Sequence, residues 1–176
     1  AQAKATLPLG SEGQIESVER VIDGDTFKLS NGQNLKLAGI NAPVLHDAPT
    51  LTREAKRFKK EIWAYRNLGV DAMTEVETLL GLSGNQIRLE SNSEGFDDMG
   101  HLLAYVYIPV DHLKEGAAPD ETIILKKGNH YEVFLNAYLV KLGLAEVIEE
   151  GKTGPYGDLF LKLEQEAKGN RKGLWE

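Results

Sequence analysis

The sequence predicts an α+β protein in which a small β-barrel carries helices. The first forty residues alternate in hydrophobicity and contain two turn signals, which predicts a three-stranded meander. Later segments repeat apolar residues at three- and four-residue spacing, which predicts helices. The chain has 176 residues, of which 41% are hydrophobic and 27% charged, and these values suit one globular domain.

The meander is predicted from three segments, which are residues 13–22, 26–30 and 33–40. Asp23-Gly24-Asp25 forms the first turn. Asn31-Gly32 forms the second, because both positions accept a positive φ and so favour a tight hairpin. Residues 1–12 are small and polar, and we expect them to be a flexible lead-in to a single domain over residues 13–176.

Two helices are expected next. Thr50 or Thr52 can cap the first, whose single apolar stripe contains Ala55, Phe58, Ile62 and Tyr65. The second contains Val70, Met73, Val76, Leu79 and Leu80 and ends at Gly81. Strands follow at residues 87–89 and 102–108, then an excursion over 111–132. The chain closes with a short helix capped by Asn136 and a last helix that ends at Gly169. A barrel with this element order best fits an OB-fold.

The composition excludes several classes of protein. The chain has no cysteine, which rules out disulfides, thiolate metal sites and a cysteine nucleophile. It has 20 Lys and Arg against 27 Asp and Glu, a net charge of −7, so any contact with nucleic acid must come from a local patch. No apolar run approaches the roughly 18 residues of a membrane-spanning helix. The start at Ala1 without methionine is typical of a cleaved signal peptide, so we expect an exported protein, with a cytoplasmic one as the alternative.

Several motifs in order resemble the staphylococcal nuclease (thermonuclease) family. They are VIDGDT at 21–26, LKLAGINAP at 35–43, EAK at 54–56, GHLLAYVY at 100–107, LNAYLVKLGLA at 135–145 and KGNRKGLW at 168–175. The resemblance implies an OB-fold barrel with three helices and calcium-assisted hydrolysis of DNA and RNA phosphodiesters. It also implies insertions near residues 66–84 and 111–132, which are longer than in a minimal member.

The same resemblance indicates which parts of the family's active site remain. Asp25 matches the first calcium ligand, Asn41 stands at the second ligand aspartate, and Ala42 offers only its backbone carbonyl. Val44 stands where the catalytic glutamate follows the proline, and valine accepts no proton. Lys36 and His101 stand at the two phosphate-binding arginines, and neither has the guanidinium fork. We therefore expect a catalytically inactive or strongly impaired domain, with weak calcium binding if any.

Such a domain is expected to act by binding single-stranded nucleic acid or another protein; the oligomeric state is left open. The candidate nucleic-acid contacts are basic residues of the first helix, which are Lys56, Arg57, Lys59 and Lys60. Two alternatives remain. One is an active phosphodiesterase in which His101, Asp25 and Asn41 converge, joined by His46 and Asp47, to hold zinc or another transition ion. The other is an extracytoplasmic protein-interaction module.

Overall fold

Five strands form a closed barrel in the computed structural model, which describes residues 13–111 and 123–176. They are β1 (Gln14–Asp23), β2 (Thr26–Leu29), β3 (Asn34–Leu37), β5 (Gln86–Phe96) and β6 (Leu102–Val110). The strands pair in the order β3-β2-β1-β5-β6, and β3 also pairs in parallel with β6, which closes the barrel. The meander and the α+β class predicted from the sequence are therefore confirmed. The predicted lead-in, residues 1–12, lies outside the described residues.

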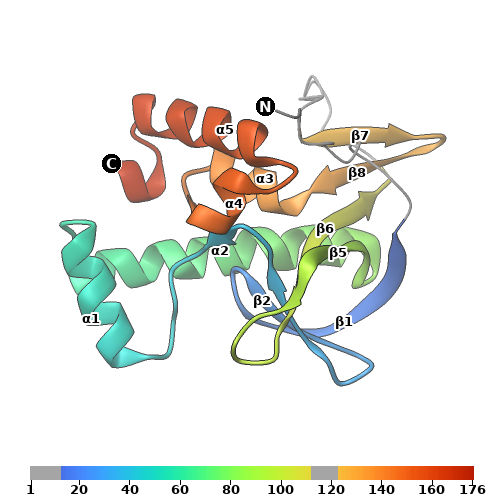
Figure 1. Ribbon diagram of the computed structural model, residues 1–176, viewed down its shortest axis with the longest axis horizontal. Coiled ribbons are helices and arrows are strands. Elements are labelled where there is room, and N and C mark those ends of the chain that lie inside the picture. The colour runs from blue at the N-terminus through green and yellow to red at the C-terminus, as the bar shows by residue number, and fades with distance from the viewer. Residues whose placement is uncertain (1–12, 112–122) are drawn as a thin grey trace.

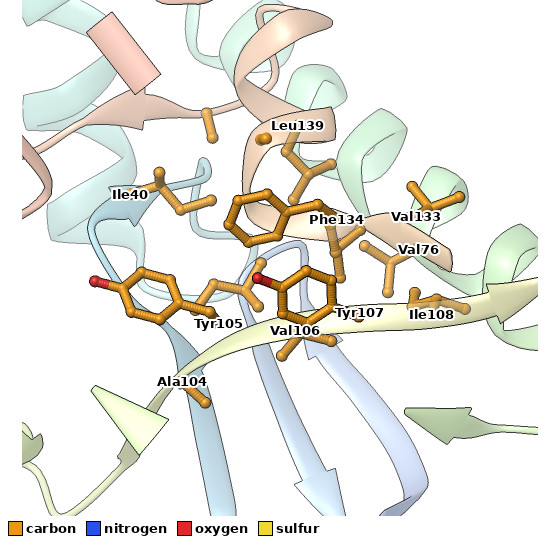
Figure 2. Close-up of a cluster of buried hydrophobic side chains, with 14 of the residues drawn as sticks. Ile40, Val76, Ala104, Tyr105, Val106, Tyr107, Ile108, Val133, Phe134 and Leu139 are labelled. Atoms are coloured by element: carbon orange, nitrogen blue, oxygen red, sulfur yellow. The ribbon is translucent and has the colours of Figure 1, made fainter. Parts of the chain in front are cut away.

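Strand β6 forms the centre of the core. Tyr105 and Tyr107 are at most 1% exposed and point from the same side of β6 toward Phe134, as Figure 2 shows. Tyr107 stacks on Phe134 with ring centroids 4.8 Å apart, and its hydroxyl lies 2.8 Å from the Tyr156 hydroxyl. These tyrosines therefore pack the barrel and offer no exposed surface for stacking a base.

The predicted third strand ends earlier than residue 40. A turn at Ala38 and Gly39 separates β3 from β4 (Ile40–Asn41), which pairs with β9 (Glu146–Val147) in a second, two-stranded sheet. Gly39 has φ +81, and a Cβ there would lie 2.9 Å from the Cα of Gly151. The turn places Asn41 opposite Glu146, a residue distant in the sequence.

The first predicted helix is two helices, α1 (Ala48–Arg57) and α2 (Ile62–Ser83). Lys59 has φ +56, which breaks the helix, so the predicted single stripe is wrong at Ile62, whose exposed fraction is 48%. Asp47, not a threonine, precedes α1. The second predicted helix is the continuation of α2, which ends at Ser83 with Gly84 as its C-cap, not at Gly81, and includes most of residues 66–84.

The remaining elements are a β-hairpin and three helices. The hairpin of β7 (Ile124–Lys127) and β8 (His130–Phe134) extends the sheet from β6, so part of the predicted excursion is β-structure. Residues 112–122 of that predicted insertion lie outside the described residues. The helices α3 (Leu135–Lys141), α4 (Glu149–Thr153) and α5 (Gly157–Gly169) group together above α2 in Figure 1. Among the described residues, no helix is long and apolar enough to cross a membrane.

Asn136 does not cap α3, because Phe134 precedes the helix and Asn136 lies within it, fully buried. Its side chain accepts a hydrogen bond from the Val106 backbone N–H at 2.9 Å and donates to the Ala38 carbonyl at 3.0 Å. The amide therefore links α3, β6 and the turn that precedes β4.

A small second hydrophobic core packs α1, the start of α2 and the C-terminal end of the chain against one another. Its buried members are Leu51, Ala55, Tyr65 and Leu174, and Val44, Phe58 and Trp175 pack against them. Leu174 and Trp175 belong to a closing 3-10 turn, Gly173–Trp175, which lies beside α1 in Figure 1. This cluster holds α1 against α2 and so fixes one wall of the cleft described next.

Candidate functional site

A cleft of about 450 Å³ collects all the residues predicted from the family's active site. Its walls come from the β1–β2 turn, the β3–β4 region, α1, the β5–β6 hairpin and β9. The predicted residues that line it are Asp25, Lys36, Asn41, Ala42, Val44 and His101. His46 and Asp47 do not line it, so the structure does not bring these two residues to Asp25.

Asp25 is held rigidly in the turn after β1 and is 4% exposed. Its Oδ1 accepts a hydrogen bond from the Thr26 hydroxyl at 2.9 Å, and its Oδ2 accepts one from the Ala42 backbone N–H at 2.8 Å. Asp23 lies beside it. Burial and the neighbouring Asp25 carboxylate raise the pKa of Asp23 to about 8. The pair therefore carries less than its full negative charge at neutral pH.

Lys36 bends along the cleft floor toward the β4 backbone. Its Nζ donates a hydrogen bond to Asn41 Oδ1 at 2.6 Å and to the Ile40 carbonyl at 3.1 Å, and it lies 3.8 Å from Asp25 Oδ2. The ammonium is therefore directed at oxygen atoms of the chain itself.

His101 forms a close pair with Asp97 at the tip of the β5–β6 hairpin. Asp97 Oδ2 lies 2.9 Å from His101 Nδ1, and Asp97 Oδ1 accepts the His101 backbone N–H at 2.8 Å. Partial burial opposes the ionised carboxylate, but these hydrogen bonds hold the pKa of Asp97 below its usual value. The pairing fixes the orientation of the imidazole, which lines the cleft, and the sequence did not single out Asp97 for this role.

Val44 contributes packing to the cleft wall. It is half-buried against the small core of Leu51, Tyr65 and Leu174, and it also lines the cleft. An apolar side chain at this position makes the wall between α1 and the barrel hydrophobic.

Arg57 is engaged by two acidic residues that the sequence did not single out for the site. Its Nε donates to Glu54 Oε2 at 2.7 Å, and its guanidinium forms a two-pronged ion pair with Glu146 of β9. Glu146 raises the pKa of Arg57 further above its usual range. The bond unites α1 with β9. By contrast, Lys56 and Lys59 are exposed, and Lys60 reaches the Glu176 carbonyl at 3.3 Å.

Acidic groups outnumber permanent cations in the cleft lining. The five carboxylate residues are Asp23, Asp25, Glu54, Asp97 and Glu146, whereas the two permanent cations are Lys36 and Arg53. A phosphate entering such a cleft meets net repulsion unless another cation accompanies it.

The model of the family described as staphylococcal nuclease homologue matches residues 34–176. The chain belongs to this family. The matched range does not include β1 and β2. The inclusion of Asp25 in the candidate site therefore depends on the local VIDGDT motif and on the position of Asp25 in the cleft. No curated protein matches the chain in a search for relatives.

The donors in the cleft fit the family's calcium ion poorly. Calcium requires six to eight oxygen ligands, and its affinity rises with their charge. Asn41, where the resemblance implies a second ligand aspartate, offers only a neutral amide, and its Oδ1 already accepts a hydrogen bond from the Lys36 ammonium. Among residues 13–111 and 123–176, no three or more His, Asp or Glu side chains are grouped to hold a metal ion.

We expect about 1 mM Ca²⁺ to leave the melting temperature unchanged. A ligand stabilises the fold by RT ln(1+[L]/Kd), which is negligible when Kd exceeds the ligand concentration. Differential scanning fluorimetry with and without Ca²⁺ checks this, and a clear rise contradicts it. A rise with micromolar Zn²⁺ that is lost in His101→Ala indicates instead the zinc site of Asp25, Asn41 and His101.

Proposed function

We propose that this staphylococcal nuclease homologue lacks ordinary calcium-dependent nuclease activity and acts as a binding domain for single-stranded nucleic acid. The lining of the cleft is the observation that supports the proposed loss of nuclease activity. Lys36 is directed at the chain's own oxygens, and acidic residues outnumber the permanent cations of the cleft even though the raised pKa of Asp23 leaves that residue largely protonated. Val44 supplies no base for water, and His101 has no guanidinium fork.

The binding surface is the corner between α1 and α2. Lys56, Lys59 and Lys60 line a shallow hollow there together with the aliphatic side chains of Ala55 and Ile62. The positive φ of Lys59 turns the chain at this point, and the exposed lysines gather around the turn. Arg57 is also exposed, but we leave it out of the proposed contacts because its guanidinium is already paired with Glu54 and Glu146.

Trp63 adds an aromatic side chain next to this basic corner. It is 68% exposed in the first turn of α2, adjacent to Ile62 of the hollow. Exposed aromatic rings beside cationic side chains bind single strands, because every base has a π face and every nucleotide a phosphate. An anionic bilayer is a poorer fit, since the outward face of α1 carries Thr52, Arg53 and Lys56 rather than apolar residues.

Binding at the corner should be weak at physiological salt and salt-sensitive. Each phosphate neutralised on a single strand contributes about −0.7 to the slope of log K against log salt, so the three lysines give a slope of about −2, and a fourth cation such as Arg57 would make it no steeper than about −3. Fluorescence anisotropy with an unstructured oligonucleotide at several salt concentrations measures it. Lys56→Glu with Lys59→Glu should abolish binding, and Trp63→Ala should weaken it.

A matched control reverses two exposed lysines on other elements, Lys126→Glu on β7 with Lys162→Glu on α5, and changes the net charge equally. If both double variants bind alike, the corner is only a solvated helix face. If the wild type shows no salt-sensitive binding even at low ionic strength, a protein partner becomes the better account of the domain.

A second candidate function is phosphodiester hydrolysis by a rebuilt site. The close contact between Asp97 and His101 favours it, because a carboxylate that orients an imidazole is a recurrent feature of general bases and metal ligands. Cleavage of single-stranded DNA or RNA tested separately with Ca²⁺, Mn²⁺ and Zn²⁺ decides between the two. Metal-dependent cleavage that disappears in His101→Ala supports this candidate, and its absence with all three ions rejects it.

A further inference from the structure

The ammonium group of Lys36 is surrounded by oxygen atoms at one point of the cleft. Two of them, Asn41 Oδ1 and the Ile40 carbonyl, accept its hydrogen bonds, and Asp25 Oδ2 lies 3.8 Å away. Two of the three N–H donors of the ammonium are used in these hydrogen bonds, and the Asp25 carboxylate adds an ion-pair contact. The Lys36 side chain is only 22% exposed, so the group is held in the cleft and not extended into solvent.

We propose that Lys36 is a tethered cation that takes the place of a metal ion among the oxygens of Asp25, Ile40 and Asn41. Carboxylate, amide and backbone carbonyl oxygens are the ligands of hard divalent cations. A second cation at these oxygens would lie against the ammonium and be repelled by it. The inference rests on the proposed loss of calcium-dependent nuclease activity, and it supplies a physical cause for that loss.

The tethered cation also explains how the buried Asp25 remains stable without metal. Thr26 and Ala42 each donate one hydrogen bond to its carboxylate, but neither carries a positive charge. Lys36 supplies the charge from the adjacent strand, where it stands directly opposite Thr26 in the β2–β3 ladder. Without Lys36, the carboxylate lacks its nearest cation and the oxygens become available to a divalent ion.

Two variants that differ only at Lys36 test the inference. Asn41→Asp restores the second carboxylate while Lys36 is still present to pair with it. Lys36→Met with Asn41→Asp removes the ammonium as well. Isothermal titration with Ca²⁺ should give at least about tenfold tighter binding for the double variant than for Asn41→Asp, because the ammonium no longer occupies the oxygens or repels the ion. The double variant should also melt lower without Ca²⁺ and recover when it is added.

The matched control is Lys28→Met with Asn41→Asp. Lys28 lies on β2, pairs with Glu19 at 3.2 Å and does not line the cleft, so the control removes the same net charge without freeing the oxygens. It should bind Ca²⁺ no better than Asn41→Asp alone. Lys36→Gln with Asn41→Asp serves if the methionine variant does not fold, since glutamine keeps a hydrogen-bond donor without the charge.

Equal Ca²⁺ affinity in Asn41→Asp and in the Lys36 double variants overturns the inference, and so does the absence of Ca²⁺ binding in every folded variant. Either result leaves the proposed function standing as long as the wild type binds oligonucleotides without cleaving them. Conversely, a wild type that hydrolyses DNA with Ca²⁺ rejects the proposed loss of activity directly.

Discussion

Single-stranded DNA incubated with the wild-type protein and saturating Ca²⁺ should be hydrolysed at least about 10³-fold more slowly than by a family member with an intact site. Removal of one transition-state donor commonly lowers the rate by about 10² to 10³. The resemblance to the family implies that Val44 stands at the position of the base and that Lys36 and His101 stand at those of two arginines, and all three residues line the cleft. The effects of several such losses are not additive. The roughly 10³-fold reduction is therefore a lower bound that corresponds to the loss of a single group. Release of acid-soluble nucleotides measures the rate.

Restoration of the family's residues should recover part of the activity, because the cleft already brings these positions together. The restoring substitutions are Lys36→Arg, Asn41→Asp, Val44→Glu and His101→Arg. A matched variant that keeps Val44 and carries the other three should stay inactive, since no carboxylate activates the water. Wild-type hydrolysis within about tenfold of an intact member contradicts the prediction, and it then favours the rebuilt site with Asp97 and His101.

Local patterns in the sequence predict most of the fold. Alternation and the Asn31-Gly32 signal place the meander correctly, because these features depend on neighbouring residues only. The break between α1 and α2 is missed, since Ala55, Phe58, Ile62 and Tyr65 continue a helical spacing through it. In the structure, the positive φ of Lys59 and the extended backbone of Glu61 separate the two helices, and no glycine or proline in the sequence marks that break.

The site residues that lie in recognisable sequence motifs can be predicted from the sequence, whereas those brought to the site by strand pairing distant in the sequence cannot. Asp25, Asn41 and His101 lie on separate elements, yet the family's motifs are enough to expect them in one cleft, as the structure finds. Glu146 enters the cleft because β9 pairs with β4 across more than a hundred residues, and no local signal predicts that pairing. The spacing from Asp97 to His101 across a glycine turn is the one signal that could have indicated their contact.

The buried amide of Asn136 is another tertiary contact that the local sequence does not predict. Substitution of Asn136 should cause a large loss of stability. Asparagine near the start of a short helix predicts a cap, but the side chain reaches Val106 and Ala38 inside the protein. Asn136→Ala leaves the Val106 N–H and the Ala38 carbonyl without their side-chain partner in a fully buried region. Each unsatisfied group costs about 1–3 kcal/mol, so the free energy of unfolding should fall by about 3 kcal/mol.

Urea unfolding followed by circular dichroism measures this loss, with an unchanged m-value as the sign that the unfolded state is the same. Asn67→Ala in the exposed face of α2 is the control, because surface substitutions away from such bonds stay within about 0.5 kcal/mol. Asn136→Asp should be at least as damaging as alanine, since a carboxylate accepts from Val106 but donates nothing to Ala38. A loss below about 1 kcal/mol in Asn136→Ala would show that the amide is not what links α3 to β6 and to the turn before β4.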